Sequence, residues 1–156
     1  MKKVIMTICV ALCALSFFVV PLGQKAVAAT TPDKDLTVMS ATMVFAVVGD
    51  MMRNPGGYVG ETIKMRGVYS EFSDGNTGKT YHTCIVKDAT ACCAQGIEFE
   101  LPESVEYPPI NSEITVIGTM DTYRNESLQI AAGIDPAQYG LILDVCILRN
   151  AELLPE

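Results

Sequence analysis

The chain has 156 residues, 49% of them hydrophobic, and carries 11 Lys and Arg against 18 Asp and Glu, with one His and no Trp. This length suits one small domain plus whatever the ends add. The net charge of −7 opposes binding to nucleic-acid backbones. The single histidine, His82, leaves little scope for histidine-based acid–base catalysis.

The first 28 residues have the features of a secretory signal peptide. Lys2 and Lys3 precede an apolar run over residues 4–20, Pro21 breaks that run, and Ala26-Val27-Ala28 offers the small-x-small pattern of a cleavage site. We predict cleavage after Ala28 and a secreted or cell-envelope location. The alternative is an uncleaved anchor, because the run approaches the roughly 20 residues that span a bilayer.

The mature chain is then strongly acidic, since residues 29–156 hold 8 basic and 18 acidic residues. We interpret residues 29–36 as a short polar linker and residues 37–156 as one domain. No second run in the mature chain is long and apolar enough to suggest a membrane span.

A helix is predicted from about Val38 to Arg53, capped by Asp35 or Thr37 and ended by the Pro55-Gly56 break. Apolar residues recur at three- and four-residue steps along it, which predicts one buried stripe. The stripe comprises Val38, Ala41, Phe45, Val48 and Met52, widened by Met39, Met43 and Ala46. We interpret its methionines as core packing rather than as a copper site.

From Thr62 onward the pattern alternates with period two, which indicates strands. Strands are predicted at residues 62–72, 81–86, 97–101, 114–120, 128–132 and 141–148. Gly118 lies within one of them, where a glycine would permit a tight barrel bend. The fold class is therefore mainly β, a small OB-like antiparallel barrel with one N-terminal helix, and a β-sandwich is the alternative.

Several segments carry a resemblance to an uncharacterised family of exported bacterial proteins. They are residues 40–44, 51–55, 58–60, 65–67, 88–99 and 113–119, and the most specific is Cys92-Cys93-Ala94-Gln95-Gly96. This double-cysteine segment is also similar to the soluble subunit of a predicted two-component permease often found beside metal-uptake genes. The resemblance covers about residues 38–124. It implies an OB-like fold, a cell-envelope setting and a membrane permease or envelope protein as partner, but no particular activity.

Four cysteines remain after the leader: Cys84, Cys92, Cys93 and Cys146. Export places them where disulfides persist, so one interpretation is a bridge from the Cys92-Cys93 turn to Cys146 or Cys84. A vicinal Cys92–Cys93 bond is a minor option because its ring is strained. Buried free thiols and a redox pair are the other non-metal interpretations, although the Cys-x-x-Cys spacing of oxidoreductases is absent.

The same cysteines also suggest a zinc site. His82 and Cys84 are two apart in a predicted strand and share a face, and a hairpin centred at Asp88 would bring Cys84 opposite Cys92 and Cys93. Three thiolates and an imidazole suit tetrahedral zinc. The predicted function is a non-enzymatic binding or accessory module of the cell envelope linked to zinc handling. The alternative is a thiol- or metal-dependent enzyme using this cluster.

Other polar and aromatic residues give weaker signals. Glu98 and Glu100 alternate with apolar residues, which predicts a solvated strand face. Aromatic residues are expected to line the open face of the barrel, where they would bind a ligand or complete the core. They are Tyr58, Tyr69, Phe72, Tyr81 and Tyr123.

Overall fold

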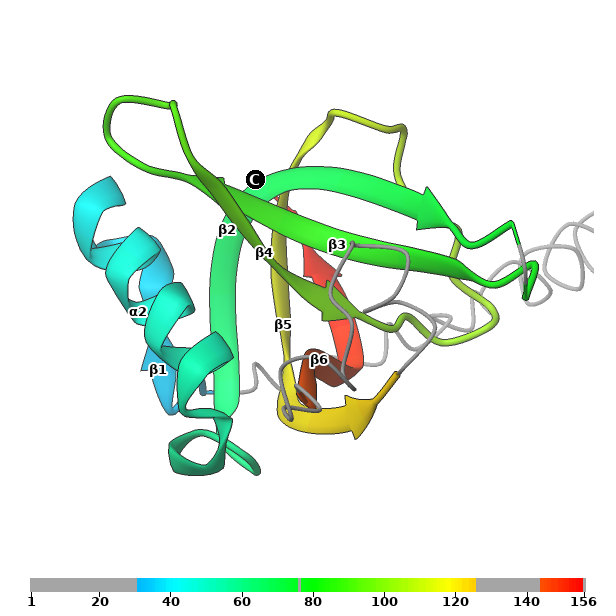
Figure 1. Ribbon diagram of the computed structural model, residues 1–156, viewed down its shortest axis with the longest axis horizontal. Helices are drawn as coiled ribbons and strands as arrows, with labels where there is room; N and C mark the ends of the chain where they lie inside the picture. The colour runs from blue at the N-terminus through cyan, green and yellow to red at the C-terminus, as the bar shows by residue number, and fades with distance from the viewer. Residues whose placement is uncertain (1–30, 76, 126–143, 156) are drawn as a thin grey trace, which may run out of the picture. The chain divides into compact units, whose positions relative to one another are not determined.

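A computed structural model describes residues 31–75, 77–125 and 144–155 (Figure 1). The helical segments are the 3-10 turn η2 (Leu36–Val38), the helix α2 (Ala41–Arg53) and the 3-10 turn η3 (Pro55–Gly57). The strands are β1 (Lys34–Asp35), β2 (Thr62–Ser73), β3 (Thr80–Lys87), β4 (Ala94–Phe99), β5 (Glu113–Arg124) and β6 (Asp144–Leu154). The predicted leader and the predicted strand at 128–132 lie outside the described residues.

Five of these strands close into a barrel. The sheet runs β2-β3-β4-β6-β5, and β5 pairs again with β2. The β4–β6 pairing is parallel, whereas the other pairings around the barrel are antiparallel. The predicted OB-like barrel is therefore confirmed, and the two-sheet alternative is wrong because no open edge separates two layers.

Strand β2 belongs to both halves of the barrel. Residues 62–68 pair with β5 and residues 68–73 pair with β3, so Val68 lies opposite both Glu113 and Ile85. Figure 1 shows β2 as a long, strongly curved ribbon. A Cβ at Gly67 would lie 2.4 Å from the Ile85 carbonyl oxygen, so only glycine fits where β3 crosses this bend.

Gly118 has the role predicted for it. The β5–β6 register shifts between Ile117 and Thr119, which places a bulge at this glycine. A Cβ there would lie 2.9 Å from the Cβ of Leu148 and 3.1 Å from the Arg149 carbonyl oxygen. The missing side chain lets β6 approach β5 closely at the bend.

Residues 31–36 are part of the fold, in contrast to the linker expected there. Strand β1 pairs in parallel with β2, with Lys34 opposite Ile63. The backbone N–H of Asp33 donates to the Thr62 carbonyl over 2.8 Å, and Leu36 is fully buried. Short polar stretches give no periodic signal, so the sequence did not reveal this pairing.

The helical segment also starts differently from the prediction. Asp35 caps η2 by accepting from the Thr37 N–H, whereas Ser40 caps α2 by accepting from the Met43 N–H over 3.4 Å. The extended backbone of Met39 (ψ 158°) separates the two. The single helix from Val38 is therefore wrong at its first turn, because Ser40 is a strong N-cap residue that starts the helix later.

The buried face of α2 is rotated from the predicted stripe. Val48 and Met51 are fully buried, whereas Val38 is 80% and Met52 45% exposed. Phe45 is only half-buried. The helix contacts β3, β4 and β6, and Gly49 faces Gln95, where a Cβ would lie 2.8 Å from the side-chain oxygen. Gly49 is buried on the same face of α2 as Val48.

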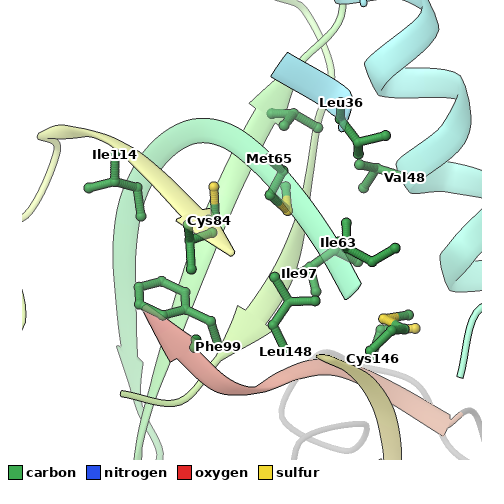
Figure 2. Packing of buried hydrophobic residues seen from close by; sticks show 14 of the residues in the cluster. Leu36, Val48, Ile63, Met65, Cys84, Ile97, Phe99, Ile114, Cys146 and Leu148 are labelled. Carbon is green, nitrogen blue, oxygen red and sulfur yellow. The ribbon is translucent and has the colours of Figure 1, made fainter. Parts of the chain in front are cut away.

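The barrel interior and the inner face of α2 form one core. Figure 2 shows its buried side chains, with Cys84 and Cys146 among the apolar ones. The largest fully buried members include Tyr69, Phe99, Leu36, Met51 and Ile63. In the part of the chain that the structure describes, no helix is long and apolar enough to cross a lipid bilayer.

Candidate metal site

The β3–β4 hairpin tip carries the adjacent cysteines. Lys87 pairs with Ala94, so a six-residue loop, Asp88–Cys93, joins the strands. The Asp88 N–H donates to the Cys93 carbonyl over 3.1 Å, and the Ala91 N–H donates to the Asp88 carbonyl over 3.0 Å. Ala91 takes a left-handed backbone conformation (φ 55°), which turns the chain back toward β4.

This register overturns one part of the predicted site. The hairpin is centred between Thr90 and Ala91 rather than at Asp88, and Cys84 therefore pairs with Ile97 instead of Cys92. Three strand residues, Ile85 to Lys87, thus lie between Cys84 and the loop at the hairpin tip. The sequence marked the turn but did not indicate where its centre lies.

Three side chains of types that can ligate a metal ion do meet at the tip. The ligand atoms of Asp88, Cys92 and Cys93 all lie within 4.8 Å of one another. The two Sγ atoms are 3.6 Å apart, and the Cys92 Sγ is 3.3 Å from Asp88 Oδ2. Both cysteines are exposed and Asp88 is half-exposed. No other group of three or more such residues is found within the described ranges.

These spacings match the edges of a zinc coordination tetrahedron. With Zn–S bonds of about 2.3 Å and Zn–O bonds of about 2.0–2.2 Å, tetrahedral angles place two sulfurs roughly 3.8 Å apart and a sulfur and an oxygen roughly 3.5 Å apart. The observed separations of 3.6 and 3.3 Å differ from these by small rotations of exposed side chains. The site therefore offers two sulfurs and one oxygen to a tetrahedral ion.

Hydrogen bonds within the loop set the protonation of these groups. The Thr90 hydroxyl donates to Asp88 Oδ2 over 2.8 Å and is the main cause that lowers the pKa of Asp88, so the carboxylate is charged at neutral pH. The hydrogen bond with Cys92 raises the pKa of Cys93, with smaller contributions from burial and the Asp88 charge. Metal binding here must therefore displace thiol protons, which makes it pH-dependent.

His82 and Cys84 are not part of this group. Cys84 is fully buried, and burial raises the pKa of its thiol to about 12. The Nδ1 atom of His82 lies 2.8 Å from the Tyr69 hydroxyl, and its ring stacks on Tyr107 at 3.5 Å between centroids. Burial lowers the pKa of His82, so it is neutral at pH 7. The predicted four-residue zinc site of His82, Cys84, Cys92 and Cys93 is therefore not formed.

Cys146 also makes its contacts in the core and not at the hairpin tip. It is buried in β6, and its thiol donates to the Met51 carbonyl over 3.4 Å. All four described cysteines are free thiols, so the predicted bridge from the hairpin tip to Cys84 or Cys146 is absent. Both proposed partners point into the core, which the exposed tip does not reach.

A second feature is a hollow of about 520 Å³ at one rim of the barrel. His82, Glu98, Tyr107 and Tyr123 are among its lining residues. Glu98 was predicted to be solvated but is only 7% exposed, and burial raises its pKa although the Tyr123 hydroxyl donates to it. Of the expected open-face aromatics, Tyr123 lines this hollow, whereas Tyr58 instead bonds Asp50 of α2 over 2.6 Å.

Asp88 is the site residue that the sequence did not identify as a ligand. Because Asp88 stands at the start of a turn, its position in the sequence is explained by the turn alone. The one indication of a ligand role is that Asp88 lies four and five residues before Cys92 and Cys93. No protein-family model matches the chain, and no curated protein is similar to it at a significant level.

Proposed function

We propose that the protein is an exported accessory module of the cell envelope that binds zinc at Asp88, Cys92 and Cys93. The observation that supports this most strongly is that the three ligand atoms lie within 4.8 Å of one another, and that the two separations from Cys92 Sγ, 3.6 and 3.3 Å, are close to the edge lengths of a zinc tetrahedron. The tripartite leader at residues 1–28 supports export. The similarity of the double-cysteine segment to the soluble subunit of a predicted permease often found beside metal-uptake genes supports a role in metal handling.

Zinc is favoured over other ions by the donor set. Two thiolates and a carboxylate combine soft and hard donors, which suits zinc, whereas magnesium and calcium prefer oxygen alone. Copper(I) also accepts two thiolates, but the carboxylate of Asp88 is a harder donor than this soft ion prefers. The three deprotonated ligands carry three negative charges, which over-neutralise the divalent ion and favour its binding.

A thiol enzyme built on Cys84 has no support from the geometry. The thiolate is the nucleophile in such enzymes, and burial raises the pKa of the Cys84 thiol to about 12. Cys84 is enclosed by core residues, so a substrate cannot reach it without opening the barrel. A non-enzymatic binding role remains the better supported function.

Metal titration of the purified protein tests the proposal. We expect about one zinc ion per chain, and with cobalt(II) as a spectroscopic substitute a sulfur-to-cobalt charge-transfer absorption whose intensity corresponds to two thiolates. Cys92→Ser and Cys93→Ser should each weaken binding at least tenfold, and Asp88→Asn should weaken it less because one oxygen ligand is replaced by a neutral one.

The controls separate the two candidate ligand sets. His82→Gln and Cys84→Ala should leave zinc affinity unchanged, since neither side chain reaches the hairpin tip. Retained binding in the double variant Cys92→Ser/Cys93→Ser would refute the proposed site. N-terminal sequencing of the exported protein tests the cleavage after Ala28, and a mature chain starting at Met1 would indicate the anchor instead.

A further inference from the structure

We propose that the site at Asp88, Cys92 and Cys93 carries its metal ion in transit, handing it by direct ligand exchange to a second protein that presents thiolate or imidazole donors. This inference rests on the proposed function and adds the fate of the bound ion. Three features of the hairpin tip carry it: an open coordination position, a loop that is closed without metal, and an exposed position.

The first feature is the incomplete coordination sphere. Structural zinc sites have four protein ligands, and sites with three leave a position for an exogenous group. Asp88, Cys92 and Cys93 supply three, and no fourth Cys, His, Asp or Glu joins them in the described part of the chain. The fourth position is therefore available to a donor atom of another molecule.

The second feature is that the loop keeps its shape by itself. Backbone hydrogen bonds close it from Asp88 to Cys93 and from Ala91 to Asp88. Cys92 and Cys93 lie outside the core cluster of the barrel. Folding therefore does not depend on the metal, in contrast to a structural site, so the protein can be loaded and emptied without unfolding.

The third feature is exposure. Catalytic zinc is held in a shaped cavity that excludes water around the reacting group. Here both cysteine side chains are exposed at the end of a two-stranded hairpin, with Lys87 and Ala94 exposed at its base. An acceptor loop can approach such a tip from several directions, whereas a small substrate finds no enclosing wall.

The exchange can be written bond by bond. An acceptor thiolate or imidazole first fills the open position, and the zinc–oxygen bond to Asp88 then breaks. The carboxylate keeps a partner, because Thr90 already donates to Asp88 Oδ2 over 2.8 Å. Further acceptor donors replace Cys92 and Cys93, which take up two protons from water. The acceptor thiols lose their own protons on binding, and no electrons are transferred.

Transfer kinetics test the inference. The zinc-loaded protein is mixed with increasing excess of a zinc-free synthetic peptide bearing a Cys-x-x-Cys pair, and zinc appearance on the peptide is followed. We expect a rate that rises linearly with peptide concentration, because the acceptor takes part in the rate-limiting step. The matched control is the same peptide with both sulfurs methylated, which should not accelerate release.

Three outcomes are distinguishable. Absence of zinc binding refutes the proposed function itself. Bound zinc that leaves at a rate independent of peptide concentration refutes direct exchange and leaves the function standing. Circular dichroism of the metal-free protein gives the third outcome: unfolding at room temperature on zinc removal would make the site structural and overturn the inference.

Discussion

The thiol of Cys146 in β6 donates a hydrogen bond to the backbone carbonyl of Met51 in α2, over 3.4 Å. The two residues are 95 positions apart in the chain, and both are buried. This contact fixes the last turn of α2 on the barrel. The side chain of Met51 is fully buried, whereas Met52, the next residue, is 45% exposed.

The adjacent methionines give a matched test of helix docking. Met51→Ala should lower the free energy of unfolding by about 2–5 kcal/mol, because it leaves a cavity in the core. Met52→Ala should change it by less than about 0.5 kcal/mol, since much of that side chain is in water. Urea denaturation monitored by circular dichroism measures both. Equal effects of the two substitutions would show that α2 does not dock by this face.

Gly118 provides a second prediction. A Cβ there would lie 2.9 Å from the Cβ of Leu148, so Gly118→Ala forces β5 and β6 apart and should destabilise the fold by about 1–3 kcal/mol. Gly57→Ala is the control, because nothing lies within 4 Å of a Cβ at that position. Thermal denaturation compares the two. A stable Gly118→Ala protein would contradict the close approach of the two strands at the bulge.

Thiol reactivity should divide the cysteines into two pairs. Cys92 and Cys93 are exposed and should react with iodoacetamide in the folded, metal-free protein. Cys84 and Cys146 should react only after unfolding, because burial raises their pKa to about 12 and about 11 and also blocks the reagent. Mass spectrometry of proteolytic peptides assigns each modification. Labelling of Cys84 as fast as Cys92 in the folded state would be incompatible with its place in the core.

The buried carboxyl group of Glu98 should make the free energy of unfolding depend on pH in a known direction. Burial is the main cause that raises the pKa of Glu98 above the ordinary 4.5. At a pH between 4.5 and this raised pKa, Glu98 therefore carries a proton in the folded protein but has lost it in the unfolded chain. This group's contribution to the free energy of unfolding therefore increases as pH falls through its folded pKa toward 4.5.

The variant Glu98→Gln isolates this contribution because it cannot titrate. The unfolding free energy of the wild-type protein minus that of Glu98→Gln should rise when the pH is lowered from 7 to 4.5. Glu103→Gln, at an exposed position of the same hollow, is the control and should give a smaller change. A difference that falls on acidification would show that Glu98 is ionised more easily in the folded state.

The barrel was predictable from the sequence because each strand shows its own alternation of apolar and polar residues, and turn residues mark where the strands end. The irregularity at Gly118 was also predictable, because a glycine within an alternating strand is itself a local sign of a bend or bulge. The rotation of α2 was not predictable, since the helix packs on β3, β4 and β6, which are far from it in the chain. Of the candidate metal site, the cysteine pair was evident from the sequence. The turn centre lies two to three residues later than predicted, so Asp88 lies beside the two cysteines in place of Cys84 and His82.

The position of β6 in the barrel has a consequence for when the protein can fold. This last strand lies between β4 and β5 and pairs with both, while β5 pairs with β2 more than 40 residues earlier. The barrel therefore cannot close before Asp144–Leu154 is available to pair with both strands. Such long-range pairing folds slowly, on a scale of about milliseconds to seconds for β barrels. Until then β4 and β5 each have an unpaired edge.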